Sequence, residues 1–460
     1  MSHASPHGTS LGRRLAAGGA WATVGKGATL GLNFLAVAVV ARVLDPSDAG
    51  AYFLGQSVAS AAAMVARLGL ESTVVYLVST ALGGGNPARA RRMIRQIILV
   101  GASSAALVGA FLSLGGAAFI GHTIFRSDLV ARIGTVIGVW SAALALQMLL
   151  SEAFRGFHAI REAVLFGGVI TGAATILGLG APRLLGTPLS LESAVWIAAG
   201  AALTNAVLAG ITLTVRSRAL GPSMTAEPGE MALVFRSALP VLVNNVMTFV
   251  LLNVDVWVVG SHLPEREVAV YAAAARMVTL MSLSLLIANQ VLPPVIGELF
   301  ARGDKRLLER VLRGTAAAVA PPALVVLALF IFAGPFVLRT GFGPVYEKGA
   351  PVLALLSVGQ LFCAITGSSV PVLLMTGHQH AAMWTSGAAA LPATCGSLFA
   401  VPRWGATGVA FATSSVVVIQ QIATLVLAHR LAGVWTHASV SEIRVALREM
   451  RERRNARSSP

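Results

Sequence analysis

Charged side chains stand inside long apolar stretches of this sequence, where an ionised group is costly to place. Lys26, Arg67 and Arg276 are cations, and Glu71 and Asp255 are carboxylates. An ionised group near the centre of a bilayer costs about 2.5–3.5 kcal/mol on insertion scales, so such residues normally face a partner or a water-filled cavity. Arginine offers paired hydrogen-bond donors and lysine a compact charge, and both suit a phosphate or pyrophosphate. These residues therefore predict a cationic cavity that binds an anionic substrate.

Uncharged polar side chains accompany these charges and are expected to line the same cavity. Arg67 and Glu71 are four residues apart, so they can pair on one face of a helix. Asp255, with Glu71 beside it as a second candidate, is expected to couple transport to an ion. The alternative is that all these groups join helices to one another or reach toward the interface, and bind no ligand. The predicted polar lining is Asn244, Asn245, Asn253, Asn289 and Gln290.

The composition of the chain indicates which elements position these residues. Of 460 residues, 56% are apolar and 12% are charged, with a mean hydropathy of +0.77. Soluble domains carry about 25% charged residues, so this surface has too few charges to face water. The 34 Lys and Arg residues outnumber the 19 Asp and Glu residues, and they lie mainly in short runs between apolar stretches. This pattern favours cytoplasmic loop ends over a nucleic-acid surface. We predict an all-α, polytopic membrane protein.

Twelve apolar stretches are long enough to be transmembrane helices, which need about 20 residues each. Most Lys and Arg residues fall in connections on the side of the N-terminus, which predicts cytoplasmic N- and C-termini. The spans are expected at 15–41, 50–82, 96–121, 133–151, 163–182, 193–215, 237–260, 268–297, 314–338, 349–376, 381–402 and 404–429.

Two short matches suggest that the chain is an internal repeat. VARVLDPSDAGAYF at 40–53 resembles VGSHLPEREVAVYA at 259–272, and the turn at 155–158 resembles the one at 376–379. The offsets are 219 and 221 residues, although chance similarity of short loops is the alternative. Duplicated helix bundles with a site between them are a recurring transporter design. The expected organisation is a cytoplasmic tail at 1–14, an N-lobe at 15–215, a linker at 216–236, a C-lobe at 237–430 and a basic amphipathic tail at 431–460.

Several stretches also resemble a known family. GKGATLGLNFLAVAVVARVLDPSDAGAYFLGQS at 25–57 is similar to the opening of polysaccharide transporters in the superfamily shared by O-antigen flippases, the lipid II flippase and multidrug/toxin extruders. Further similar stretches are RLGLE at 67–71, EAFRGFHAIREA at 152–163, DVWVVGSHLPEREVAVYAAAARMVTL at 255–280, ANQVLPPVIGELFARGDKRLLERV at 288–311 and VPRWGATGVAFATS at 401–414.

The resemblance implies two six-helix bundles in a V that alternates between inward- and outward-open states. It implies an undecaprenyl-pyrophosphate-linked oligosaccharide as substrate, moved across the cytoplasmic (inner) membrane. Lys26 and Arg276 match helices that carry basic cavity residues in lipid II flippases, and Asp255 matches the helix of an acidic residue in the multidrug branch. The first helix lacks the Arg-Asp pair of lipid II flippases, and helices thirteen and fourteen are missing, which favours the O-antigen and exopolysaccharide branch.

Two other functions stay open at this point. An H⁺- or Na⁺-coupled drug or cation antiporter of the same superfamily should have a net acidic site, which the excess of Lys26 and Arg276 disfavours. A membrane-embedded polysaccharide polymerase would need a sizeable loop carrying catalytic side chains, and no connection exceeds roughly twenty residues. We therefore expect no enzymatic activity, cofactor, metal or nucleic-acid partner. The expected partners are a lipid-linked oligosaccharide and membrane lipids, with a polysaccharide polymerase and a chain-length regulator as further candidates.

Overall fold

The computed structural model describes residues 7–221 and 230–439, and these are helical apart from short connections. The predicted amphipathic helix of the C-terminal tail, which begins at Val440, lies outside the described residues. The contacts divide the chain into two units, residues 1–249 with 264–269, and residues 250–263 with 270–460. Each unit is described by itself.

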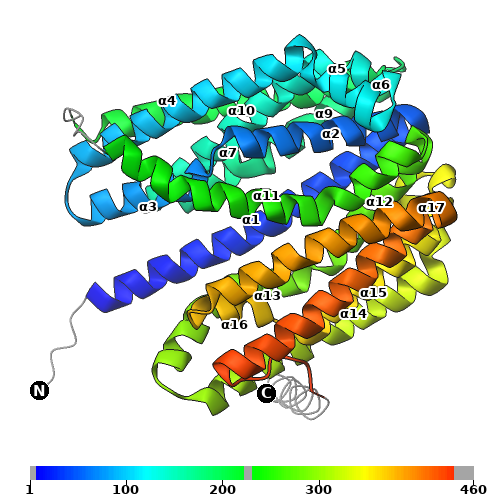
Figure 1. The fold of residues 1–460 in the computed structure, drawn as a ribbon. Helices are drawn as coiled ribbons and strands as arrows, with labels where there is room; N and C mark the ends of the chain where they lie inside the picture. The colour runs from blue at the N-terminus through cyan, green and yellow to red at the C-terminus, as the bar shows by residue number, and fades with distance from the viewer. Residues whose placement is uncertain (1–6, 222–229, 440–460) are drawn as a thin grey trace, which may run out of the picture. The chain divides into compact units, whose positions relative to one another are not determined.

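In the first unit, α7 is the central helix and packs against α2, α3, α4 and α10 (Figure 1). Short π-helical turns at Leu112–Gly116, Gly121–Phe125 and Leu165–Val169 interrupt the helices that follow α4 and α8. The helices of this unit are α1 (His7–Val43), α2 (Pro46–Ala66), α3 (Leu70–Gly83), α4 (Pro87–Phe111), α5 (Ala117–Ile120), α6 (Asp128–Arg132), α7 (Gly134–Gly156), α8 (Ile160–Val164), α9 (Ile170–Leu184) and α10 (Leu191–Arg218).

Helix α11 (Glu230–His262) begins in the first unit and ends in the second. In the second unit, α15 packs against both α14 and α17. A 3₁₀ turn at Pro344–Gly349 leads into α15. The remaining helices are α12 (Glu265–Met281), α13 (Leu283–Ala301), α14 (Lys305–Phe342), α15 (Ala350–Thr366), α16 (Ser369–Met375) and α17 (Gln379–Ala432).

Helix α17 is 54 residues long and folds back on itself at Gly405, where φ is 56° and ψ is −144° (Figure 1). The Gln420 amide donates to the Ser386 hydroxyl at 3.5 Å, and Gly396 faces Ala412, so the two segments run antiparallel. A glycine suits this position because an L side chain is strained at positive φ. The segments 379–404 and 406–432 each have about the length of one membrane crossing.

Among the described residues, ten helices are long and apolar enough to cross a membrane, or eleven if α12 and α13 form one span bent by 50°. The all-α membrane fold predicted from the sequence is confirmed, while the number twelve stays a prediction. Three predicted spans are not continuous helices. The span at 50–82 breaks after Ala66, the one at 268–297 breaks at Ser282, and the one at 349–376 breaks at Gly367.

Helix ends in the two units recur at a nearly constant offset. Helices α1 and α11 end at Val43 and His262, and α2 and α12 begin at Pro46 and Glu265, 219 residues apart in both cases. Helices α4 and α14 begin 218 residues apart, each capped by the side chain before it: Asn86 accepts from the Arg89 N–H, and Asp304 from the Leu307 N–H, both at 3.0 Å. Such caps satisfy helix donors that have no partner within the helix. The repeat offset thus extends to helix starts and caps that the two sequence matches do not include.

Candidate functional site

Lys26 lies on α1, at the point where this helix packs closely against α8. A side chain on the neighbouring Gly25 would overlap Val164, so glycine permits the close approach. The Thr29 hydroxyl donates to the Gly25 carbonyl at 2.9 Å. The Lys26 side chain is exposed and lies within electrostatic range of Glu152 on α7. The ammonium group can therefore reach an anion while its helix stays packed.

Arg67 and Glu71 lie on either side of a helix break. Helix α2 ends at Ala66 and α3 begins at Leu70, so the interpretation of one continuous helical face is wrong. Leu68 and Gly69 between them have φ of 53° and 74°. The ion pair forms nevertheless, with 3.7 Å between Arg67 Nε and Glu71 Oε1, and each side chain is 16% exposed.

Close packing of α11 explains the break. A Cβ on Gly69 would overlap the backbone of Ala238 and Leu242, both in α11. Only glycine combines this close contact with a left-handed backbone at no steric cost. Leu70 follows and is fully buried in a core that includes Val234 and Ala238 of α11. The break therefore aims Glu71 at α11.

The asparagines predicted to line a cavity lie in different environments. Asn245 donates its amide to Glu71 Oε1 at 2.6 Å, so it belongs with the ion pair. Asn244 is exposed and Asn253 is half-buried. Asn289 on α13 accepts a 2.6 Å hydrogen bond from Ser368, which joins α13 to the connection between α15 and α16. The side chain of Gln290 lies outside the described part of the structure.

Glu152 is a charged residue of this site that sequence reasoning missed. It pairs with Arg155 at 3.3 Å and lies within electrostatic range of Lys26, Arg67 and Glu71. Its side chain is 22% exposed. The expected span ended at 151, whereas α7 continues to Gly156 and keeps Glu152 within the helix. An extension of the span to the arginine three residues later would have included it.

We call Lys26, Arg67, Glu71, Glu152 and Asn245 the first-unit cluster. The five side chains come from α1, the junction of α2 and α3, α7 and α11. Two cations face two carboxylates, so the cluster is close to neutral when all four are ionised. Its most accessible charge is Lys26, because Arg67 and Glu71 are mostly buried.

Asp255, Tyr271 and Arg276 form a second polar group, which we call the second-unit cluster. Asp255 is 8% exposed, and its two carboxylate oxygens accept hydrogen bonds from the Tyr271 hydroxyl and the Val256 N–H, both at 2.8 Å. Tyr271 is fully buried. Arg276, one and a half turns along α12, is exposed and within electrostatic range of Asp255. Each unit therefore pairs an accessible cation with a less accessible carboxylate.

The structure does not bring the residues predicted for one cavity into one group. Lys26 and Arg67 belong to the first unit, whereas Arg276 belongs to the second, so a shared cavity stays a prediction. Within the described residues, no group of three or more His, Cys, Asp or Glu side chains could hold a metal ion.

The sequence and the fold both match known membrane proteins. Residues 15–300 match the model of a family described as "Polysaccharide biosynthesis protein". The succinoglycan biosynthesis transport protein ExoT of Rhizobium meliloti (strain 1021) is 24% identical over 414 residues, which cover 84% of this chain and 75% of that protein.

Solved structures with a similar fold share little sequence. An inward-facing multidrug resistance MATE family transporter of the MOP superfamily has a TM-score of 0.73 at 15% identity, over 88% of this chain and 94% of that one. The lipid II flippase MurJ in an inward closed conformation has a TM-score of 0.60 at 13% identity, over 88% and 86% of the two chains. These similarities establish the fold of the chain.

Proposed function

Because the chain belongs to the polysaccharide biosynthesis protein family, we propose that it moves a lipid-linked oligosaccharide across the cytoplasmic membrane by alternating access. The match over residues 15–300 carries this proposal. It extends from α1 into α13 and includes Lys26, Arg67 and Arg276. ExoT, which resembles this chain over most of its length, is a succinoglycan biosynthesis transport protein. A glycan-export function is therefore favoured over drug or cation extrusion.

The charges suit a substrate that carries a pyrophosphate. Lys26 and Arg276 are exposed, and each lies near a carboxylate that lowers the cost of holding the cation within the membrane. A pyrophosphate would replace that carboxylate as the preferred partner, because it offers several charged oxygens to the same donor. In our proposal, Lys26 and Arg276 hold the pyrophosphate, the sugars pass through a water-filled cavity, and the prenyl chain stays in lipid.

Asp255 is the proposed ion-coupling residue, with Glu71 as a second candidate. Asp255 is buried, and its stable environment depends on the Tyr271 hydroxyl. A carboxylate in such a place changes its interactions strongly when it gains a proton, which can bias one conformation over another. Glu71 has a different environment, because Arg67 and Asn245 both contact it.

The proposal also fixes an orientation and a set of partners. Both termini would lie in the cytoplasm, since the basic connections fall on that side. The substrate would come from enzymes that assemble oligosaccharides on a prenyl carrier. A polysaccharide polymerase and a chain-length regulator would act on it after translocation.

The test uses proteoliposomes that contain the full chain and a fluorescent prenyl-pyrophosphate oligosaccharide. Translocation is followed by protection from a membrane-impermeant quencher. Loss of one charge-assisted contact is worth about 1.5–3 kcal/mol, so Arg276→Ala and Lys26→Ala should each slow translocation by about tenfold or more. The matched control is Arg302→Ala, an exposed arginine whose partner is Glu298.

Normal translocation by both variants would remove the cations from the mechanism. A wild-type protein that moves cationic drugs but not the labelled lipid would instead establish the antiporter function.

A further inference from the structure

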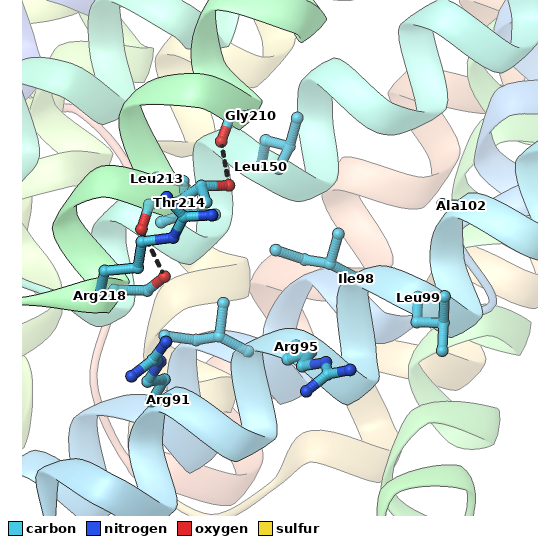
Figure 2. A pocket seen from close by; sticks show the side chains of 12 residues that line it. Arg91, Arg95, Ile98, Leu99, Ala102, Leu150, Gly210, Leu213, Thr214 and Arg218 are labelled. Atoms are coloured by element: carbon cyan, nitrogen blue, oxygen red, sulfur yellow. Dashed lines mark hydrogen bonds between the residues drawn. The ribbon is translucent and has the colours of Figure 1, made fainter. Parts of the chain in front are cut away.

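A cleft of about 510 Å³ opens between α4 and α10, with Leu150 of α7 in its floor (Figure 2). It lies entirely in the first unit and contains no residue of the first-unit cluster. Its volume falls within the range of sites that bind small molecules. It is lined by Arg91, Ile94, Arg95, Ile98, Leu99, Ala102, Leu150, Gly210, Leu213, Thr214, Ser217 and Arg218.

Charge and apolar surface are separated along this cleft. Arg91 and Arg95 lie near the start of α4, and Arg218 is the last residue of α10, so all three mark the same end (Figure 2). Further along α4 the lining is apolar, from Ile98 to Ala102. At 1.5 Å per residue, Arg91 and Ala102 are about 16 Å apart along the helix axis. None of the twelve lining residues is acidic.

The arginines of the cleft differ in what they contact. Arg91 donates to the carbonyl of Gly221, which fixes its side chain beside the end of α10. Among the residues that the structure describes, Arg95 and Arg218 form no ion pair, and both are exposed. By contrast, Arg216 on the last turn of the same α10 pairs with Glu162 at 2.9 Å. The cleft therefore presents at least two cations whose charge no carboxylate neutralises.

We propose that this cleft binds an anionic phospholipid, with its phosphate on Arg95 and Arg218 and an acyl chain along Ile98, Leu99 and Ala102. Basic pockets between transmembrane helices on the cytoplasmic side are suited to anionic headgroups. The guanidinium groups match phosphate oxygens in geometry. A free phosphate ion would leave the apolar part of the cleft in contact with water, which favours a lipid as the occupant. This site is separate from the proposed transport residues and does not depend on them.

The experiment measures lipid binding to the delipidated full-length protein in detergent by native mass spectrometry. Dioleoyl phosphatidylglycerol is compared with dioleoyl phosphatidylcholine, and inorganic phosphate is added as a competitor. A basic residue near an anionic headgroup contributes about 1 kcal/mol, or about fivefold in affinity. We expect the double variant Arg95→Gln, Arg218→Gln to bind phosphatidylglycerol about 25-fold more weakly. Arg216→Gln, with the same charge change on α10, should stay within twofold of the wild type.

A second variant tests the apolar part of the site. Ala102→Trp keeps every charge but fills the cleft, so it should weaken phosphatidylglycerol binding by at least fivefold, with gel filtration reporting on folding. Equal affinity for both lipids, equal weakening by Arg216→Gln, or competition by millimolar phosphate would each overturn the proposal. If Ala102→Trp does not fold, the Arg95 and Arg218 variants alone decide the outcome.

Discussion

The first-unit and second-unit clusters lie on equivalent helices but are stabilised differently. Tyr52 and Tyr271 are 219 residues apart, near the starts of α2 and α12, and both are buried. The Tyr271 hydroxyl donates to Asp255, whereas Tyr52 packs against Trp140 with 5.5 Å between ring centroids. The residue 219 positions before Asp255 is Ala36. The buried carboxylate therefore belongs to one half only.

The helix breaks in the two halves differ as well. The break between α2 and α3 contains two residues with positive φ, and it brings Arg67 and Glu71 together. The break between α12 and α13 falls at Ser282, whose φ is −76° and whose hydroxyl donates to Gln360 at 2.7 Å. One half thus depends on a glycine and an ion pair, and the other on neutral hydrogen bonds. This teaches that a duplicated backbone plan does not require duplicated chemistry.

The largest expected effect comes from adding a side chain at the first break. Gly69→Ala would place a Cβ against the backbone of α11, which cannot move aside as a side chain can. We expect a loss of stability of at least about 4 kcal/mol, the range of severe core changes. The measurement is the yield of monodisperse protein and its thermal midpoint in detergent.

Gly303→Ala is the matched control for Gly69→Ala. Gly303 has nearly the same φ, 73°, but a Cβ there would meet nothing within 4 Å. Its cost should be limited to backbone strain of about 1–3 kcal/mol. Equal destabilisation by the two variants would show that close packing on α11 does not matter.

Removal of one partner from the first-unit ion pair should have the next largest effect. Arg67→Ala leaves Glu71 mostly buried with only Asn245 as a partner. Breaking a buried pair in this way costs about 3–5 kcal/mol. Arg155→Ala, which removes a half-exposed arginine from its pair with Glu152, should cost only about 0–1 kcal/mol. Thermal unfolding of both variants measures the difference, and similar values would mean that the Arg67 pair is effectively solvated.

A smaller effect is expected for the second-unit cluster. Tyr271→Phe removes one donor from the buried carboxylate of Asp255, and hydrogen bonds to charged groups contribute about 1.5–3 kcal/mol. Tyr52→Phe should be less destabilising, because the equivalent position near Tyr52 carries Ala36 rather than an acid. If the Tyr52 variant unfolds at the lower temperature, the proposed difference between the halves is wrong.

The smallest effect is a pH dependence found only in the second unit. Burial lowers the pKa of His437, and Arg313 lowers it further while Glu309 opposes the change. The unfolded chain therefore takes up the proton more readily, so the contribution of His437 is complete above about pH 6.5 and declines as the pH falls below it. The thermal midpoint should decrease from pH 7.5 to pH 5.5, and His437→Gln should reduce that slope. An unchanged slope in the variant would contradict the assignment.

Sequence patterns predicted much of the fold because membrane helices follow a simple physical rule. Apolar stretches of about 20 residues indicate helices, since no other element satisfies its backbone within lipid without closing into a barrel. The spans at 163–182 and 193–215 correspond to Ile160–Pro182 and Leu191–Arg218. The breaks at Gly69 and Ser282 were missed, because a window average of hydropathy does not register one or two residues of changed backbone.

For the candidate site, the sequence alone determined which residues carry charge inside the apolar stretches and that these charges need partners. The tertiary structure decided who the partners are: Asn245 with Glu71, Tyr271 with Asp255, and Glu152 within range of Lys26. The physical reason is distance along the chain. The cost of an ionised group in lipid is a property of the residue and its position, whereas pairing across 174 residues, as between Glu71 and Asn245, depends on how helices pack.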